Sequence, residues 1–252
     1  MVKLAQLNKI KVGAVSYLNT KPLLYGFKQT NILKRIDLFE DYPSKIAAML
    51  LNEEIDVGLV PVAVIKNLKE HFIISDYCIA SENEVASVAI FSNKPLEEIT
   101  HVYLDYQSKT SVNLTKILFK YFWKKNVEFI NASENYINEI DGSTAGLIIG
   151  DRALNAMEHF TFQYDLAKAW KSFTGLPFVF AAWVANKNLP TDFIEQFNAA
   201  NAVGVEKIDE VVEYLDYKNY NLKKYFTENI SYVLDDEKRK GLALFLKLMD
   251  DL

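Results

Sequence analysis

Residues 10–61 read IKVGAVSYLNTKPLLYGFKQTNILKRIDLFEDYPSKIAAMLLNEEIDVGLVP. The runs with the apolar composition of strands are residues 10–15, 36–39 and 57–60. The two segments between these runs have helical patterns, the first opened by Pro22 and the second by Pro43, which continues to about Leu51. The order strand, helix, strand, helix, strand predicts a parallel sheet with helices on its faces.

The same alternation begins again in the second part of the chain. Strand patterns lie at residues 102–105, 127–130 and 146–149, and helical patterns lie between them at about 110–124 and 134–140. Two long β-type runs, 72–80 and 85–91, precede this part, and the apolar run 178–185 follows it. Beyond Pro190 the pattern is helical to the end of the chain.

This repetition predicts an α/β protein of two lobes. We expect residues 1–92 and 178–252 to form the first lobe and residues 93–177 the second, because the helical end of the chain must pack on a sheet that is already built. The chain would then cross between the lobes near residues 91–95 and 175–177, and two crossings form a hinge beside a central cleft. Ligands of open α/β sheets bind beyond the carboxyl ends of strands, so the loops at those ends form the candidate site.

The composition excludes several classes of protein. Half of the 252 residues are apolar and 13% are aromatic, which is enough for a sizeable core. A single cysteine excludes a disulfide scaffold and a multi-cysteine zinc site. The net charge of −5 argues against a nucleic-acid-binding protein, and no apolar run approaches the roughly 18 residues of a membrane span. Most basic residues are lysines, so we expect anions to be held largely by groups other than arginine.

The N-terminal segment predicts no export. Its polar residues, including Gln6 and Lys9, interrupt any apolar stretch of the roughly 7–15 residues that a secretory signal needs. We therefore expect a cytoplasmic protein that acts on a small molecule and binds neither nucleic acid nor a membrane. The sequence leaves the oligomeric state open, and a homodimer is one option.

Three strand-to-helix loops are dense in small polar residues: 16–22, 105–111 and 150–153. Each places hydroxyl, amide or carboxylate groups at a helix N-terminus, where free backbone N–H groups and the helix dipole favour an anion. Helix capping accounts for any one such loop, whereas three loops at one cleft favour a ligand. Ser87 lies in an apolar strand pattern and needs a partner, either a backbone carbonyl of the sheet or a ligand.

The usual catalytic residues offer little. His71, His101 and His159 lie outside these loops, and we expect Cys78, in an apolar strand pattern, to be an inert core thiol. The common metal-binding and nucleotide-binding motifs do not occur in the sequence, so we expect neither a metal nor a cofactor. We interpret the tyrosine-rich residues 214–225 as a solvated helix surface.

Six segments occur in the order seen in one known family: VSYLNTKPL (15–23), EIDVGLVPV (54–62), VASVAIFS (85–92), YQSKTSVNL (106–114), GLIIGD (146–151) and TGLPFVFAAW (174–183). Through them the chain resembles the chorismate dehydratases of menaquinone biosynthesis. The resemblance covers about residues 10–186 and implies the two-lobed fold of type II periplasmic binding proteins, with a hinge and a central cleft. The related dihydroxynaphthoate synthase has an SPCPNDTF-like first loop that this chain lacks, and Asn19 in the first loop here favours the dehydratase.

The resemblance implies that the chain removes water from chorismate to give 3-enolpyruvylbenzoate, or 3-[(1-carboxyvinyl)oxy]benzoate, in the futalosine route to menaquinone. It implies that Asn19 and Ser87 lie at the reacting centre. The residues implied to bind substrate are Ser16, Tyr17, Ser108, Thr110, Ser111, Gly150 and Asp151. We interpret Arg152, which follows them, as a surface residue at a helix start rather than as a ligand of a substrate carboxylate.

None of the implied hydroxyl and amide groups titrates near neutrality, so the sequence offers no obvious general base. We hypothesise that a carboxylate of the substrate takes the proton, with the side chain of Asp151 as the alternative. Two other functions are compatible with the same sequence: a solute-binding or sensor protein for a small acid, and an enzyme acting on another enolpyruvyl or aromatic acid. The fold does not separate these functions, because function is determined by the site.

Overall fold

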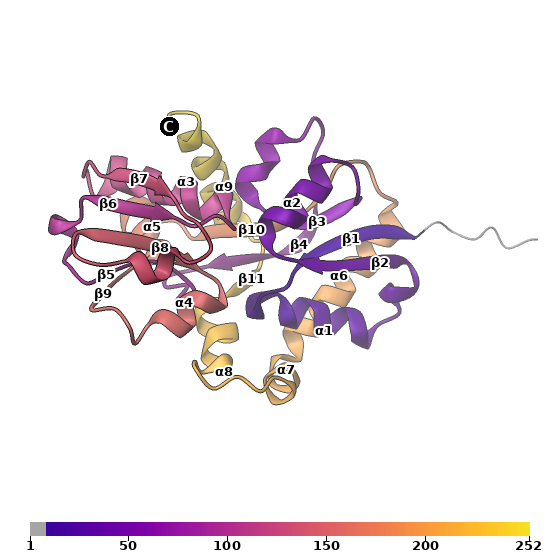
Figure 1. Ribbon diagram of the computed structural model, residues 1–252. Coiled ribbons are helices and arrows are strands. Elements are labelled where there is room, and N and C mark those ends of the chain that lie inside the picture. Colours follow the sequence, from indigo (N-terminus) through magenta and orange to yellow (C-terminus); the bar gives the residue numbers. More distant parts are fainter. Residues whose placement is uncertain (1–8) are drawn as a thin grey trace, which may run out of the picture.

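The chain forms two sheets, which Figure 1 shows as two lobes side by side. The computed structural model describes residues 9–252. Residues 1–8, which carry part of the predicted non-exported N-terminus and of the predicted first lobe, lie outside the described residues. The pattern of the sequence thus predicted the two-lobed α/β architecture correctly. No helix among residues 9–252 is long and apolar enough to cross a membrane.

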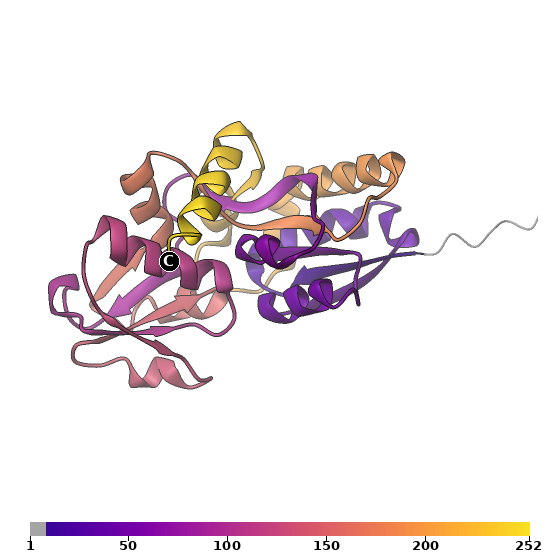
Figure 2. The same ribbon diagram turned by 90° about the horizontal axis from the view of Figure 1, so that it is seen from above.

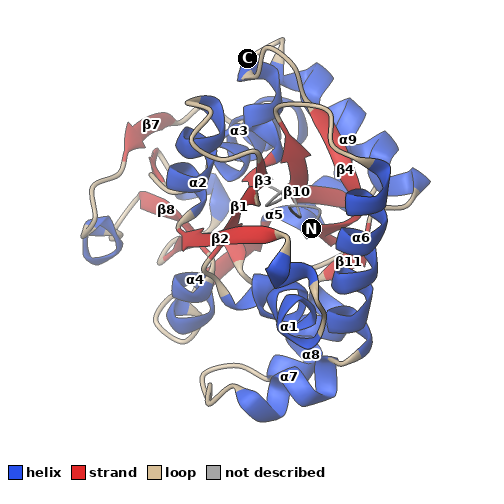
Figure 3. Cartoon of the chain, turned by 90° about the vertical axis from the view of Figure 1, so that its right-hand side faces the viewer, coloured by secondary structure: helices blue, strands red, loops and turns tan. Residues whose placement is uncertain are grey.

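The first sheet has six strands. Their order is β11 (Ser231–Val233), β4 (Phe72–Ser81), β10 (Phe178–Ala185), β3 (Val57–Pro61), β1 (Ile10–Val15) and β2 (Ile36–Asp41). Strand β1 pairs in parallel with both β2 and β3, as the predicted strand–helix order requires, whereas β10 is antiparallel to β3 and β4. Helices α1 (Lys21–Gln29) and α2 (Pro43–Leu51) cover opposite faces of this sheet (Figure 3).

A close helix pair supports the first lobe. Helix α6 (Thr191–Glu206) packs against α1, and a Cβ atom added to Gly26 would overlap the backbone of Ala200. A Cβ atom added to Gly204 would likewise overlap the backbone of Pro22. The two helices therefore approach so closely because each presents a glycine to the other, and α1 in turn fixes the loop that precedes it.

The second sheet has five strands. Their order is β7 (Glu128–Asn131), β6 (His101–Leu104), β8 (Thr144–Ile149), β5 (Val88–Ser92) and β9 (Phe162–Asp165). Strand β6 is parallel to β7 and β8, and β5 is antiparallel to β8 and β9. The helices of this lobe are α3 (Lys109–Ile117), which continues as a π-helix (Leu118–Phe122), α4 (Asp151–Ala156) and α5 (Leu166–Thr174).

Strand β5 differs from its predicted place. The predicted first lobe ends at residue 92, but β5 pairs with β8 and β9, so the chain leaves the first sheet between Ser81 and Val88. An apolar run has the same composition in either sheet, so the sequence does not indicate which strands it pairs with. The remaining division, with the second lobe over residues 93–177 and the first lobe resumed from 178, stays a prediction.

The other differences concern short elements. The predicted helix at 134–140 is a single 3₁₀ turn, Tyr136–Glu139. Strand β9 was not predicted, and β11 interrupts the region expected to be helical after Pro190. Strands of three or four residues are too short to show a period of two. The further helices are α7 (Ile208–Tyr214), α8 (Leu222–Lys224), a π-helix (Tyr225–Asn229) and α9 (Asp236–Met249), and further 3₁₀ turns are Leu18–Thr20, Ile32–Lys34, Val62–Asn67 and Leu96–Glu98.

The C-terminal helix α9 lies over the junction of the two lobes (Figures 1 and 2). It contacts β10 of the first lobe and α3 of the second. Near its start the buried Lys238 ammonium lies 2.6 Å from Asp235 and 2.5 Å from Glu82, which follows β4. The ion pair between Lys238 and Glu82 connects α9 to the segment through which the chain crosses into the second lobe.

Candidate active site

A pocket lies between the lobes, bounded by the loops that follow β1 and β6, by the segment before β5, and by the end of β8. It has a volume of about 500 Å³, including space open to solvent. Most of its wall is apolar, with Phe180 and Ile79 among the larger side chains. The polar side chains in the wall are Tyr17, Asn19, Thr20, Ser87, Ser108 and Ser111, and Gly150 contributes backbone.

The structure brings together six of the nine residues singled out from the sequence: Tyr17, Asn19, Ser87, Ser108, Ser111 and Gly150. The other three do not line the pocket. Ser16 is exposed. The Thr110 hydroxyl is buried and accepts a hydrogen bond from the backbone N–H of Ala63 at 3.1 Å. The Asp151 carboxylate accepts one from the N–H of Leu18 at 3.1 Å. These two side chains join the lobes, and the roles of all nine residues toward a substrate stay predictions.

The first loop places Asn19 within the 3₁₀ turn that links β1 to α1. The hydroxyl of the buried Tyr232, in β11, donates a hydrogen bond to the backbone carbonyl of Asn19 at 2.9 Å. The hydroxyl of Thr20 lies 3.3 Å from the Asn19 side-chain oxygen. The backbone of this loop is therefore held by the C-terminal segment, while the Asn19 amide faces the pocket.

Ser87 is held by three neighbours. Its carbonyl accepts a hydrogen bond from the N–H of Gly150 at 2.7 Å, so this backbone donor is not free for a ligand. The carboxylate of Asp165 accepts hydrogen bonds from the N–H groups of Val85 and Ala86, which precede Ser87. The hydroxyl of Tyr225 donates to the Ser87 hydroxyl oxygen at 2.7 Å. The Ser87 hydroxyl oxygen thus has a tyrosine as its partner, which the sequence did not indicate, and a ligand as a further partner stays a prediction.

Tyr225 corrects the interpretation of residues 214–225 as a solvated surface. Tyr214 is 72% exposed, but Tyr225 is completely buried. Tyr225 begins a π-helix, whose wider turn breaks the 3.6-residue period by which a buried helix face is recognised. The adjacent apolar pair of Tyr225 and the buried Phe226 was the one signal in the sequence that could have indicated burial.

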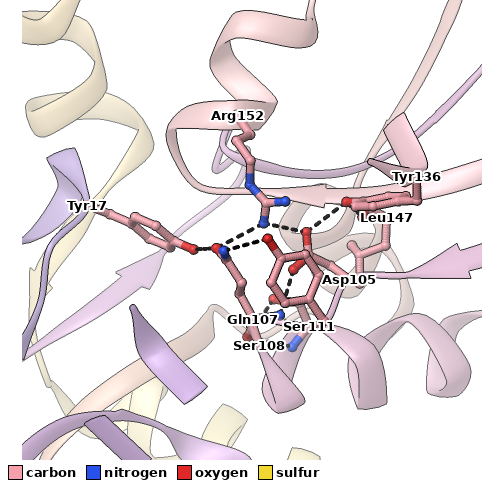
Figure 4. A network of polar contacts seen from close by, with 9 residues as sticks. Tyr17, Asp105, Gln107, Ser108, Ser111, Tyr136, Leu147 and Arg152 are labelled. Atoms are coloured by element: carbon pink, nitrogen blue, oxygen red, sulfur yellow. Dashed lines mark hydrogen bonds and ion pairs between the residues drawn. The ribbon is translucent and has the colours of Figure 1, made fainter. Parts of the chain in front are cut away.

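Behind the pocket wall lies a second polar network, shown in Figure 4. The guanidinium of Arg152 is 2.7 Å from the carboxylate of the buried Asp105 and donates to the side-chain oxygen of Gln107 at 3.0 Å. The hydroxyl of Tyr136 also donates to Asp105, at 2.7 Å. Burial raises the pKa of the Asp105 carboxyl, while Arg152 and these hydrogen bonds oppose the shift. The interpretation of Arg152 as a surface residue is corrected, because Arg152 neutralises a buried carboxylate.

Tyr17 links this network to the pocket. Its hydroxyl donates to the side-chain oxygen of Gln107 (Figure 4). Its ring lies against Gly150, where a Cβ atom would stand 2.8 Å from the ring and where the backbone has φ +63°, a conformation that favours glycine. Burial raises the pKa of Tyr17 well above its ordinary value, so the phenol stays protonated. Tyr17 therefore reaches from the first lobe across to the second.

The pocket holds few titratable groups. Of the described residues that line it, Tyr17 is the one with an ionisable side chain. Asp151 lies outside the lining, and burial raises the pKa of its carboxyl. Cys78 lies in the core, as predicted, and its burial raises the pKa of the thiol to about 12. Residues 9–252 contain no cluster of three or more His, Cys, Asp or Glu side chains that could hold a metal ion.

Comparison with known proteins gives concordant matches. A family model described as menaquinone biosynthesis matches residues 10–251. The chain is 25% identical over 263 residues to the chorismate dehydratase of Thermus thermophilus, with 94% of each chain covered. A protein of Archaeoglobus fulgidus has a similar structure, with a TM-score of 0.77 and 15% identity over 96% of this chain and 97% of that one.

A Candida albicans protein described as having the generic periplasmic binding protein fold is also similar in structure. Its TM-score is 0.66 at 14% identity, and the match covers 98% of this chain and 91% of that one. The likeness confirms the predicted periplasmic-binding-protein-like fold. At such low identity it concerns the fold alone, and the site must be interpreted from its own residues.

Proposed function

The chain belongs to the menaquinone biosynthesis family, and on that premise we propose that it is a chorismate dehydratase. In this proposal it is a hydro-lyase of the futalosine route that converts chorismate into 3-enolpyruvylbenzoate and water. The relationship to the Thermus thermophilus enzyme over 94% of both chains supports this choice. The observation that carries it is the pocket between the lobes, which combines apolar walls with hydroxyl and amide groups and contains no carboxylate in its lining.

The pocket chemistry fits a small acid that carries a ring. The apolar wall, including Phe180, would contact the ring. Ser108 caps helix α3, and its hydroxyl oxygen accepts hydrogen bonds from the N–H and the hydroxyl of Ser111 at 3.3 and 3.1 Å. A helix N-terminus favours a negative charge. We therefore assign a substrate carboxylate to the start of α3, in keeping with the few arginines of the chain.

The reaction needs a base, a departing hydroxyl and a held ring. Because no residue lining the pocket has a carboxylate, imidazole or amine, we assign the base to a carboxylate of the substrate. That carboxylate takes the ring proton, and the carbon–oxygen bond to the hydroxyl breaks as the ring becomes aromatic. The departing hydroxide takes the proton from the resulting carboxylic acid and leaves as water. Bound geometry of this kind can give effective molarities of ~10⁵ M or more. Asn19 and Ser87 would donate hydrogen bonds to the reacting oxygen atoms.

The direct test is to incubate the purified protein with chorismate and to follow the aromatic product by absorbance and mass. We expect turnover by the wild type and a loss of about 100-fold in kcat for Ser87→Ala, the size of effect that follows removal of a donor to a developing negative charge. Ser133→Ala is the matched control, since Ser133 is exposed and does not line the pocket. Absence of turnover together with tight binding of a small acid would instead support a binding or sensor protein.

The source of the base is tested by comparing Asp151→Asn with Asn19→Ala. Asn at position 151 keeps an oxygen that can accept the hydrogen bond from Leu18, so the lobes stay joined. We expect kcat to stay within about threefold of the wild type in Asp151→Asn and to fall about 100-fold in Asn19→Ala. A loss of kcat confined to Asp151→Asn would contradict a substrate-derived base and make Asp151 the base.

A further inference from the structure

The hydroxyl of Tyr225 and that of Ser87 form a buried pair that spans 138 residues of sequence. Both side chains are completely buried, and their oxygens are 2.7 Å apart. Ser87 lines the pocket, whereas Tyr225 lies behind it, in the π-helix that precedes β11. The C-terminal segment therefore holds a residue of the pocket wall through a side chain that is not itself part of the lining.

The direction of this hydrogen bond determines what Ser87 can do. A phenol is a stronger acid than an aliphatic alcohol, so Tyr225 is the donor and the Ser87 oxygen is the acceptor. The Ser87 hydroxyl then keeps its own proton for another partner, and no acceptor for it is found among residues 9–252. Since Ser87 faces the pocket, that proton is available to a bound ligand.

Tyr225 is itself fixed in its role as a donor. Burial raises the pKa of its phenol well above the ordinary value, although the side chains of Ser87 and Asn19 oppose this shift. Asn229, at the end of the same π-helix, donates to the carbonyl of Glu84 at 3.0 Å. One short segment thus holds both ends of the loop 84–87. π-Helices are often found at functional sites.

We propose that Tyr225 is a positioning residue that orients the Ser87 hydroxyl as a hydrogen-bond donor toward the departing oxygen of the substrate. The proposal rests on the dehydratase function, since it assumes a substrate hydroxyl that departs and accepts a hydrogen bond from Ser87. Tyr225 acts only by orienting the Ser87 hydroxyl through its hydrogen bond. It forms no covalent bond to the substrate and transfers no proton to it. Ser87 would accept from Tyr225 on one side and donate into the pocket on the other.

The test is a double-mutant cycle with Tyr225→Phe and Ser87→Ala, measured as kcat and KM for chorismate. Phe keeps the ring contacts with Tyr220 and Phe226. Loss of one oriented hydrogen bond should lower kcat of Tyr225→Phe about tenfold, with KM within about threefold of the wild type. In the Ser87→Ala background the same substitution should lower kcat less than about twofold, since the group it orients is gone. Equal losses in both backgrounds, or no loss in the wild-type background, would overturn the proposal.

A matched control and a substrate-free measurement complete the test. Tyr25→Phe removes a tyrosine hydroxyl that bonds Glu210 on the surface of the first lobe, and we expect it to leave kcat unchanged. Crystal structures without substrate should show one Ser87 rotamer in the wild type and several in Tyr225→Phe. An unchanged single rotamer in the variant would overturn the proposal. Because this comparison needs no turnover, it is decided even if chorismate proves not to be the substrate.

Discussion

At the scale of single residues, Asp165 holds the segment that presents Ser87 to the pocket. One of its carboxylate oxygens accepts hydrogen bonds from the N–H groups of Val85 and Ala86 at 3.0 and 2.8 Å, and the other accepts one from Lys168 at 2.9 Å. Ala86 has φ +63°, a backbone conformation that costs a residue other than glycine about 1–3 kcal/mol. Two of the hydrogen bonds of Asp165 therefore stabilise a strained turn directly before a candidate catalytic side chain, and the third caps helix α5.

The same carboxylate predicts a pH dependence of stability. Burial raises the pKa of Asp165 to about 6, and the negative charge of Glu84 adds to this shift. The hydrogen bonds that backbone N–H groups donate to the carboxylate oppose the shift. The native state therefore holds this proton more tightly than the unfolded chain between about pH 4 and pH 6. The stabilisation from Asp165 is complete below about pH 4 and is lost as the pH rises through about 6, a change of up to about 3 kcal/mol in the free energy of unfolding.

Urea unfolding of the wild type and of Asp165→Asn between pH 4 and pH 8 measures this effect. Asn does not titrate, so the wild type should lose up to about 3 kcal/mol relative to the variant across this range. Asp216→Asn, at a side chain that is 87% exposed, controls for the change in net charge. A difference between wild type and Asp165→Asn that stays constant with pH would contradict the assigned shift.

Residue types at loop positions were predictable, but their distant partners were not. The polar pattern indicated the loops 16–22 and 105–111, and the family resemblance singled out Asn19, Ser87, Ser108 and Ser111, all four of which line the pocket. Tyr225 contacts Ser87 across 138 residues, and no local pattern encodes such a contact. For the same reason the sequence offered no sign that Arg152 pairs with Asp105.

At the scale of elements, the long buried strands and the helices opened by proline were predictable. Strands β1 and β10 have the bounds that their apolar runs indicate, and α2 begins at Pro43 and ends at Leu51. Proline favours the first turn of a helix, where its missing N–H costs nothing. The π-helices Leu118–Phe122 and Tyr225–Asn229 were not predictable, because a wider turn removes the period on which the prediction depends.

The sequence did not predict with which strands a given strand pairs. Strand β5 lies in the second sheet, because it pairs with β8 and β9. This placement puts the turn at residues 85–87 in the crossing between the sheets, where Ala86 breaks the predicted strand. Ser87 consequently lies in the crossing between the two sheets rather than in the middle of a strand.

At the scale of the whole molecule, the lobes are joined on both sides of the pocket's first loop. Across the cleft Tyr17 bonds Gln107, and the N–H of Leu18 bonds Asp151. The walls of the pocket come from both lobes. We therefore expect a bound ligand to contact both lobes and to favour their closed arrangement.

Small-angle scattering tests this closure. Ser87→Ala, which we expect to bind chorismate with little turnover, should show a smaller radius of gyration with chorismate than without it. Adding Gln107→Leu removes the acceptor of the Tyr17 hydroxyl, so the double variant should need a higher chorismate concentration for the same decrease. Gln196→Ala, at an exposed position of α6, is the matched control and should leave the titration unchanged. Identical scattering profiles with and without chorismate, at a concentration that saturates binding, would contradict closure about this hinge.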